Sequence, residues 1–208
     1  GQYSPTSEQG KVTKSTPQGS LDYAFNPVSV ALGAEATFVA RTIDSDRKHM
    51  TEVLRAAAAH EGSALVEIYQ NCNIFNDGAW EPLKENDVRE DNLIRLVDGE
   101  PIIFGNNADK CVIRDSDGHL QVMDIADVDQ SQIIVFDSHA KDPGLAFGLS
   151  RLYNPRTLTN TPIGIFRDVT HREAYDRMAQ QQVADVIAAE GPGDLQVLLH
   201  GNDTWTVN

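Results

Sequence analysis

The sequence lacks the features that define several large classes of protein. Its 208 residues contain two cysteines, Cys72 and Cys111, too few for a disulfide framework, and a reducing cytoplasm is the expected compartment. We find no apolar run of membrane-spanning length and expect no signal peptide. The 17 Lys and Arg are outnumbered by 31 Asp and Glu, giving a net charge of −14. This acidity argues against nucleic acid or an anionic membrane as the main partner, since both require a basic patch.

Short motifs that would carry chemistry by themselves are also missing. The sequence has no dinucleotide glycine fingerprint, no phosphate loop, no nucleophile elbow and no Cys-x-x-Cys. Its six histidines are dispersed, and none pairs with another at metal-ligand spacing. The acidic residues Asp124, Asp127 and Asp129 lack the spacing of a calcium loop and are expected to form a solvated face. We therefore assign no catalytic residue to this chain.

What is present is a strand–helix–strand pattern between Thr37 and Asp77. Thr37–Arg41 is apolar and β-branched, and Ser45 or Asp46 is placed to cap a helix that ends near Gly62. The second strand is Ala64–Tyr69. Two strands joined by a helix run parallel, and ligands of such sheets gather beyond the carboxyl ends of the strands.

Cys72 lies three residues beyond the second strand and is the sharpest candidate for chemistry. A thiolate at this edge can act as a nucleophile or as an iron–sulfur ligand, whereas the alternative is a small buried apolar residue. We expect Cys111 to be such a buried residue, because it lies inside a strand-like run.

Residues 1–25 read as a loop rich in hydroxyl groups. The hydroxyls and two lysines, Lys11 and Lys14, suit a phosphate group, although a disordered end has the same composition. Asn26 and Pro27 form a helix start, with Asn26 as the cap.

The second half of the chain predicts a small antiparallel sheet followed by mixed elements. Four short runs separated by turn residues are expected to form an antiparallel β appendage: Leu93–Val97, Pro101–Phe104, Lys110–Arg114 and Leu120–Met123. The later elements are a strand at Ile133–Phe136, a helix at Pro143–Leu152, a strand at Thr161–Arg167, a helix at Arg172–Glu190, and a terminal hairpin or docking strand from Leu195–Leu199 and Thr204–Val207.

Long stretches of the chain resemble one known family. The segments GQYSPTSEQGKVTKSTPQG, NPVSVALGAEATFVAR and DRKHMTEVLRAAAAHEGSALVEIYQNCNIFND are similar to the beta subunit of 2-oxoacid:ferredoxin oxidoreductases, above all the 2-oxoglutarate type of actinobacteria. The resemblance is strong over residues 1–78, and IIVFDSHAKDPGLAFGLSRL with TPIGIFRDV extends it toward the end of the chain.

The resemblance implies a fold and a function. The fold class is α/β, part of a thiamine diphosphate-binding parallel-sheet fold with helices on both faces, plus the small antiparallel β appendage. Residues 1–92 would be the C-terminal part of the thiamine diphosphate-binding domain, and residues 93–208 the appendage and the C-terminal strands and helices. The implied reaction is oxidative decarboxylation of a 2-oxo acid, foremost 2-oxoglutarate, to an acyl-coenzyme A, with electrons passed to ferredoxin. An alpha subunit would be the partner.

The resemblance also implies cofactors and site residues. Family members carry thiamine diphosphate, Mg²⁺ and a [4Fe–4S] cluster. Cys72 matches the fourth cysteine ligand of the cluster, and Gly1, Gln2, Ser4 and Thr6 match the end of the thiamine diphosphate loop. The other three cysteines and the Mg²⁺ ligands of the family would precede Gly1. We therefore expect the chain to be a C-terminal fragment of the subunit that is inactive by itself.

Two alternatives stay open at this point. The chain is either part of this enzyme or a non-catalytic module that uses the same fold to bind a partner. Within the enzyme class, pyruvate or a branched-chain 2-oxo acid is an alternative substrate. For the β appendage, a structural role is favoured over docking of ferredoxin, because ferredoxins are usually acidic like this chain.

Overall fold

The structure is a computed structural model that describes residues 2–74, 76–202, 205 and 207. The chain divides into two compact units, Gly1–His171 and Arg172–Asn208.

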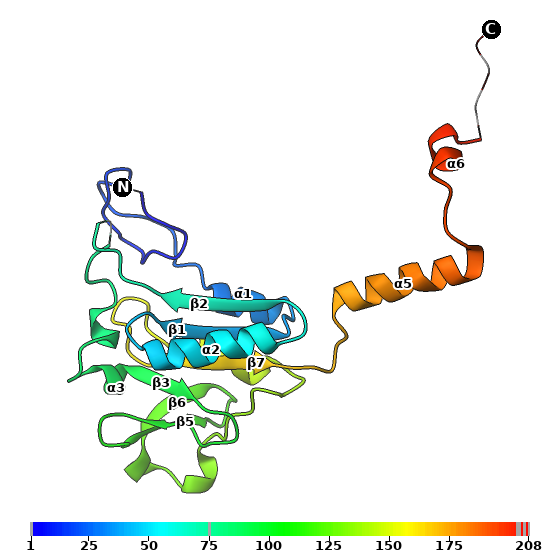
Figure 1. The fold of residues 1–208 in the computed structure, drawn as a ribbon. Helices are drawn as coiled ribbons and strands as arrows, with labels where there is room; N and C mark the ends of the chain where they lie inside the picture. Colours follow the sequence, from blue (N-terminus) through cyan, green and yellow to red (C-terminus); the bar gives the residue numbers. More distant parts are fainter. Residues whose placement is uncertain (1, 75, 203–204, 206, 208) are drawn as a thin grey trace. The chain divides into compact units, whose positions relative to one another are not determined.

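A four-stranded sheet forms the centre of the first unit (Figure 1). Its strands are β1 (Phe38–Ile43), β2 (Ala64–Tyr69), β3 (Leu93–Leu96) and β7 (Thr161–Asp168), in the order β2-β1-β7-β3. The pairs β1–β2 and β3–β7 are parallel, and β1–β7 is antiparallel. The predicted parallel pair at the start of the chain is confirmed, and the α/β fold class with it.

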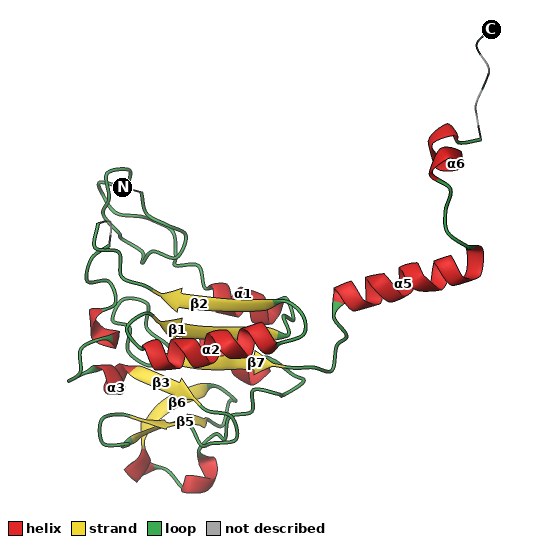
Figure 2. Ribbon diagram, in the orientation of Figure 1, coloured by secondary structure: helices red, strands yellow, loops and turns green. Residues whose placement is uncertain are grey.

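Helix α2 (Arg47–Ala59) covers one face of this sheet (Figure 2). Its buried residue Val53 packs against Phe38 and Ala40 of β1. Successive strand residues point to opposite faces, so these two side chains share the face that α2 covers.

The opposite face of the sheet is covered by α1 (Pro27–Gly33) and α4 (Gly144–Ser150). Leu32 of α1 and Leu149 of α4 are fully buried in one cluster with Val39, the β1 residue between the two that face α2. The expectation of helices on both faces is therefore confirmed.

Side-chain caps fix the starts of the first two helices as the sequence predicted. The Asn26 side-chain oxygen accepts a hydrogen bond from the backbone N–H of Ser29 at 3.0 Å. Asp46 accepts in the same way from the backbone N–H of His49 at 3.1 Å. Each cap satisfies an N–H group that has no partner within its helix.

A second, antiparallel sheet is built from three short strands. They are β4 (Ile103–Phe104), β5 (Lys110–Arg114) and β6 (Leu120–Asp124), in that order. The predicted small antiparallel sheet is therefore present.

Leu93–Val97 does not belong to this small sheet, and that part of the prediction is wrong. Leu93–Leu96 is β3 of the large sheet, parallel to β7. Leu93, Ile94 and Leu96 are buried, as expected for a strand covered on both faces rather than for the alternating pattern of a solvated hairpin.

Ile133–Phe136 is not a strand of either sheet. Ile133 forms an isolated bridge to Ile113 and Val135 forms another to Pro101, so the segment touches the appendage without joining it. The remaining short helices of the first unit are η1 (Glu81–Leu83), α3 (Arg89–Asn92), η2 (Ile125–Asp127) and η3 (Gln130–Gln132).

The second unit contains two helices, α5 (Tyr175–Glu190) and α6 (Leu195–His200). The expected hairpin is wrong for Leu195–Leu199, because Asp194 accepts from the N–H groups of Gln196 and Val197 and so starts a helix. The second expected segment, Thr204–Val207, lies partly outside the described residues. None of the helices in the described part of the chain has the length and apolar character needed to span a bilayer.

Candidate functional site

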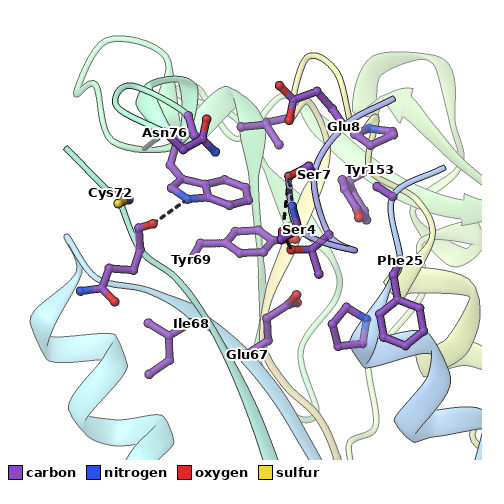
Figure 3. Close-up of a pocket in the computed structure, with 18 of the residues that line it drawn as sticks. Ser4, Ser7, Glu8, Phe25, Glu67, Ile68, Tyr69, Cys72, Asn76 and Tyr153 are labelled. Atoms are coloured by element: carbon purple, nitrogen blue, oxygen red, sulfur yellow. Dashed lines mark hydrogen bonds between the residues drawn. The ribbon is translucent and has the colours of Figure 1, made fainter. Parts of the chain in front are cut away.

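A cavity of about 500 Å³ lies between the end of β2 and the loop of residues 2–25 (Figure 3). Hydroxyl groups of the loop, the end of β2, the Cys72 turn and the segment before β7 all contribute to its wall. The principal lining residues are Ser4, Thr6, Ser7, Phe25, Glu67, Tyr69, Cys72, Asn76, Trp80, Tyr153 and Arg156. The cavity therefore lies at the carboxyl edge of the β1–β2 pair, where parallel sheets usually bind ligands.

The structure brings three of the predicted site residues together. Ser4, Thr6 and Cys72 line this one cavity although the sequence separates them widely. Gln2 lines a neighbouring hollow with Tyr3 and Pro5 instead. Gly1 lies outside the described residues. That these residues bind a cofactor or a metal stays a prediction.

The loop presents a cluster of hydroxyl groups. Ser4 Oγ lies 3.0 Å from Thr6 Oγ1 and 3.3 Å from Ser7 Oγ, and Ser7 Oγ accepts from the Ser4 backbone N–H at 3.0 Å. Hydroxyl hydrogens rotate freely to suit an acceptor. The cluster can therefore donate to the oxygens of a phosphate group that enters the cavity.

Two stacked aromatic rings form another part of the wall. The rings of Tyr69 and Trp80 lie 4.0 Å apart between centroids and are nearly parallel, at 8°. Trp80 Nε1 donates to the backbone oxygen of Gln70 at 2.9 Å, which fixes the indole beside the end of β2. Burial raises the pKa of Tyr69 far above its ordinary value, so this phenol stays protonated at neutral pH.

A buried ion pair supports the cavity. The Arg41 side chain is 0% exposed, and its Nε donates to Glu67 Oε2 at 2.6 Å. Figure 3 shows Glu67 pointing toward the cavity below Tyr69. The Arg41 guanidinium also lies over the rings of Tyr69 and Tyr153, at 5.1 and 5.2 Å from their centroids. Three lining residues are thus held by one buried cation.

Burial acts to lower the pKa of Arg41, but Tyr69 and Glu67 outweigh it and raise that pKa above its ordinary value. The buried Nη2 of Arg41 has no hydrogen-bond partner within the described residues. A buried donor without a partner normally costs stability, so a bridging water molecule is the expected partner of this atom.

The ion pair between Arg41 and Glu67 was not predicted, although the sequence contains a pattern that indicates it. Arg41 and Glu67 are charged residues inside otherwise apolar strands, and they occupy the same register position across β1 and β2. Opposite charges placed side by side in neighbouring buried strands predict a structural ion pair.

The Cys72 turn is tied to the hydroxyl loop. The backbone oxygen of Cys72 accepts from the Asn76 N–H at 2.9 Å, and Lys11 Nζ donates to the Asn76 side-chain oxygen. Glu8 pairs with Lys11 at 3.0 Å. Cys72 and Cys111 are both thiols rather than disulfide sulfurs. Cys111 is fully buried in β5, where burial raises its pKa, and the expectation for this residue is confirmed.

The described residues suit one of the expected cofactors better than the others. The hydroxyl cluster suits the acceptor oxygens of a diphosphate. By contrast, nowhere in the described ranges do three His, Cys, Asp or Glu side chains gather to hold a metal ion. The described part of the chain therefore lacks ligand sets for Mg²⁺ and for a four-cysteine iron–sulfur cluster.

A family comparison points to the same edge of the sheet. Residues 1–68 match the family described as "Thiamine pyrophosphate enzyme, C-terminal TPP binding domain". This match includes the hydroxyl loop, β1, α2 and most of β2.

Curated relatives are beta subunits of one class of oxidoreductase. The chain is 56% identical over 210 aligned positions to "2-oxoglutarate oxidoreductase subunit KorB" of Mycobacterium tuberculosis, covering 100% of this chain and 55% of the relative. It is 36% identical to "2-oxoacid:ferredoxin oxidoreductase subunit beta" of Sulfolobus sp over 50% of this chain and 33% of the relative. "2-oxoglutarate synthase subunit KorB" of Archaeoglobus fulgidus is 31% identical over 45% of this chain and 36% of the relative. The chain thus spans about half the length of the first of these relatives.

A solved structure shares the fold. It is described as a 2-oxoglutarate:ferredoxin oxidoreductase from Magnetococcus marinus with 2-oxoglutarate, coenzyme A and succinyl-CoA bound. The match has a TM-score of 0.58 at 20% identity and covers 98% of this chain and 53% of that chain. At this identity the likeness establishes the fold.

Proposed function

We propose that the chain forms part of the thiamine diphosphate site of a 2-oxoacid:ferredoxin oxidoreductase, as a member of the beta-subunit family that its resemblance implies. The observation that carries this proposal is the meeting of Ser4, Thr6 and Cys72 on one cavity at the carboxyl edge of the sheet. The family model supports thiamine diphosphate as the cofactor.

The proposed reaction is oxidative decarboxylation of 2-oxoglutarate to an acyl-coenzyme A, with electrons passed to ferredoxin and with an alpha subunit as the partner. Two relatives named for 2-oxoglutarate support this substrate. The Sulfolobus relative is named for 2-oxo acids in general, so pyruvate and branched-chain 2-oxo acids are the alternatives to test. The cytoplasm is the proposed compartment, because a reducing environment keeps cysteines as thiols.

When bound, thiamine diphosphate would supply the carbanion chemistry needed for a 2-oxo acid. The residues of this chain bind and orient. In this proposal Thr6 and Ser4 donate to the diphosphate oxygens, which are strong acceptors. The stacked Tyr69 and Trp80 close one side of the cavity against water, and Arg41 holds Glu67 in place beneath it.

Mg²⁺ and the [4Fe–4S] cluster belong to the whole enzyme in this proposal. Cys72 is proposed as one cluster ligand, with the other three cysteines and the Mg²⁺ ligands supplied from outside the described residues. The boundary between residues 92 and 93 is likewise proposed for the whole subunit, although β3 lies in the large sheet.

The test of the reaction uses the whole beta subunit, of which this chain is proposed to be a part, together with its partner subunit. Reduction of ferredoxin that depends on coenzyme A is measured with 2-oxoglutarate, pyruvate and a branched-chain 2-oxo acid. We expect 2-oxoglutarate to give the highest kcat/KM. Preference for another acid would replace the substrate, and no turnover of any of the three would favour the non-catalytic module.

The test of the cavity is a binding measurement on the whole beta subunit, because the Mg²⁺ ligands are proposed to lie outside the described residues. Thr6→Ala is expected to weaken thiamine diphosphate binding by about 10-fold, the effect of losing one hydrogen bond to a charged group. Thr13→Ala is the matched control, because Thr13 belongs to the same loop but does not line the cavity. Equal affinities of the two variants, measured by calorimetry, would remove Thr6 from the proposed site.

A further inference from the structure

Helix α5 carries an apolar stripe that the second unit does not bury. Tyr175, Met178, Val183, Val186 and Ile187 recur at helical spacing, so they share one side of the helix. Their exposed fractions range from 48% to 82%. Large apolar side chains gathered on one exposed face are typical of a surface that contacts another protein.

The second unit offers these residues no core of its own. None of its described residues is buried, and α6 also exposes Leu195, Val197, Leu198 and Leu199. A helix of 16 residues is marginal in water without tertiary packing. The stripe therefore calls for a complementary surface that stabilises α5.

Acidic residues border the stripe. With 3.6 residues per turn, Asp176 lies at its first turn, Asp185 lies two turns beyond Met178 along the same edge of the stripe, and Glu190 lies at its last turn. The single basic residue of α5, Arg177, falls on the opposite side of the helix. A surface that accepts this face must provide basic groups around an apolar centre.

Net charge also distinguishes between the polypeptides that could bind the apolar stripe of α5. Six acidic residues and two arginines give Arg172–Asn208 a net charge of −4, which leaves −10 of the chain's −14 on Gly1–His171. A second copy of the chain, or the first unit of the same chain, would bring like charge to the acidic border of α5. A different polypeptide with a basic rim suits it better.

We propose that α5 is a docking helix that lays its apolar stripe into an apolar groove, rimmed by Lys and Arg, on the partner subunit of the oxidoreductase. The inference rests on the proposed function, which requires a partner subunit. The mode is that of an amphipathic helix in a groove, in which residues at i, i+3, i+4 and i+7 act as anchors.

The test compares two double variants of the full chain. Val183→Asp with Ile187→Asp places two charges in the stripe, and Gln181→Asp with Ala188→Asp places two charges away from it. Both are produced with the partner subunit, and the affinity of the complex is measured by biolayer interferometry at low and high salt. The stripe variant is expected to raise Kd by about 100-fold, as for loss of interface anchors, and the control by less than about 3-fold.

Each result decides a separate question. Wild-type affinity that falls as salt rises supports the basic rim, and a complex unchanged by the stripe variant overturns the inference. A homodimer of the isolated wild-type chain that the stripe variant dissolves, seen by analytical ultracentrifugation, overturns it in favour of a second copy. If the complex formed by the whole beta subunit depends on α5 but turns over no 2-oxo acid, the proposed function fails while the docking helix stands.

Discussion

The two units of the chain differ in whether their apolar side chains are buried or exposed. All six residues of β1 in the first unit are buried, with α2 on one face and α1 and α4 on the other. In the second unit, the apolar stripe of α5 is exposed along its whole length. The difference shows that the first unit is held together by its own long-range contacts, whereas the helices of the second are specified by local sequence.

The polar groups follow the same division. In the first unit, buried polar side chains reach across the fold, as Arg41 does to Glu67 and as Arg167 does to Glu35 at 3.0 Å. In the second unit Gln181 donates to Asp185 and Asp194 caps α6, and both of these bonds are local. Substitutions that test this contrast are expected to affect the first unit strongly and the second weakly.

The largest effect is expected at Arg41. Arg41→Met leaves the Glu67 carboxylate without its cation beneath the cavity, and removing one partner of a buried ion pair costs about 4 kcal/mol. Urea unfolding of the full chain measures the loss. Arg41→Met combined with Glu67→Gln is the control: it should be clearly more stable than Arg41→Met alone, because it leaves no uncompensated charge. Additive losses would show that the two residues act independently.

A matched pair of isoleucines sharpens the comparison between the units. Ile163 of β7 is fully buried, whereas Ile187 of α5 is 48% exposed. Ile163→Ala should lower the free energy of unfolding by about 3 kcal/mol, because it removes buried surface and leaves a cavity. Ile187→Ala should change it by less than about 0.5 kcal/mol. A large loss at Ile187 in the isolated chain would mean that the stripe is packed in solution.

Much of the first unit was predictable because its signals are local. The bounds of β2 were predicted residue for residue, Asn26 was correctly placed as a helix cap, and the second cap is Asp46, one of the two candidates Ser45 and Asp46. The assignment of β3 failed because Leu93–Leu96 pairs with β7, a strand far along the chain, and a short apolar run does not reveal its partner. Tertiary pairing decided that strand, not its own residues.

The candidate site was predictable only in part, for a related reason. Cys72 stood out because a loop after a parallel strand lies at the ligand-binding edge. Arg41 was missed because its role depends on the register between β1 and β2, which places Glu67 directly opposite. A helix was predicted at Arg172–Glu190, but the sequence could not show that the apolar stripe of α5 is exposed.

The smallest effect on stability, and one that depends on pH, is expected at Asp168, the last residue of β7. The Asp168 side chain accepts from His60 at 2.8 Å, and its backbone oxygen accepts from His139 Nδ1. That hydrogen bond to the Asp168 carbonyl raises the pKa of His139, outweighing burial, with Asp98 at 3.8 Å and Asp137 adding to the rise. Two histidines thus fix the end of this strand.

A pKa raised in the folded state means that the folded chain binds the proton more tightly than the unfolded chain. The stabilisation by His139 is therefore complete below the unfolded pKa of about 6.5 and is lost as pH rises through the folded pKa. His139→Gln should lower Tm at pH 6 and have a smaller effect at pH 8, as measured by differential scanning fluorimetry. His200→Gln is the control from the second unit, because α6 has no buried residue. This substitution is expected to leave the Tm of the first unit unchanged. A His139→Gln effect that grows with pH would contradict this sign, and an equal effect at both values would assign His139 a neutral packing role.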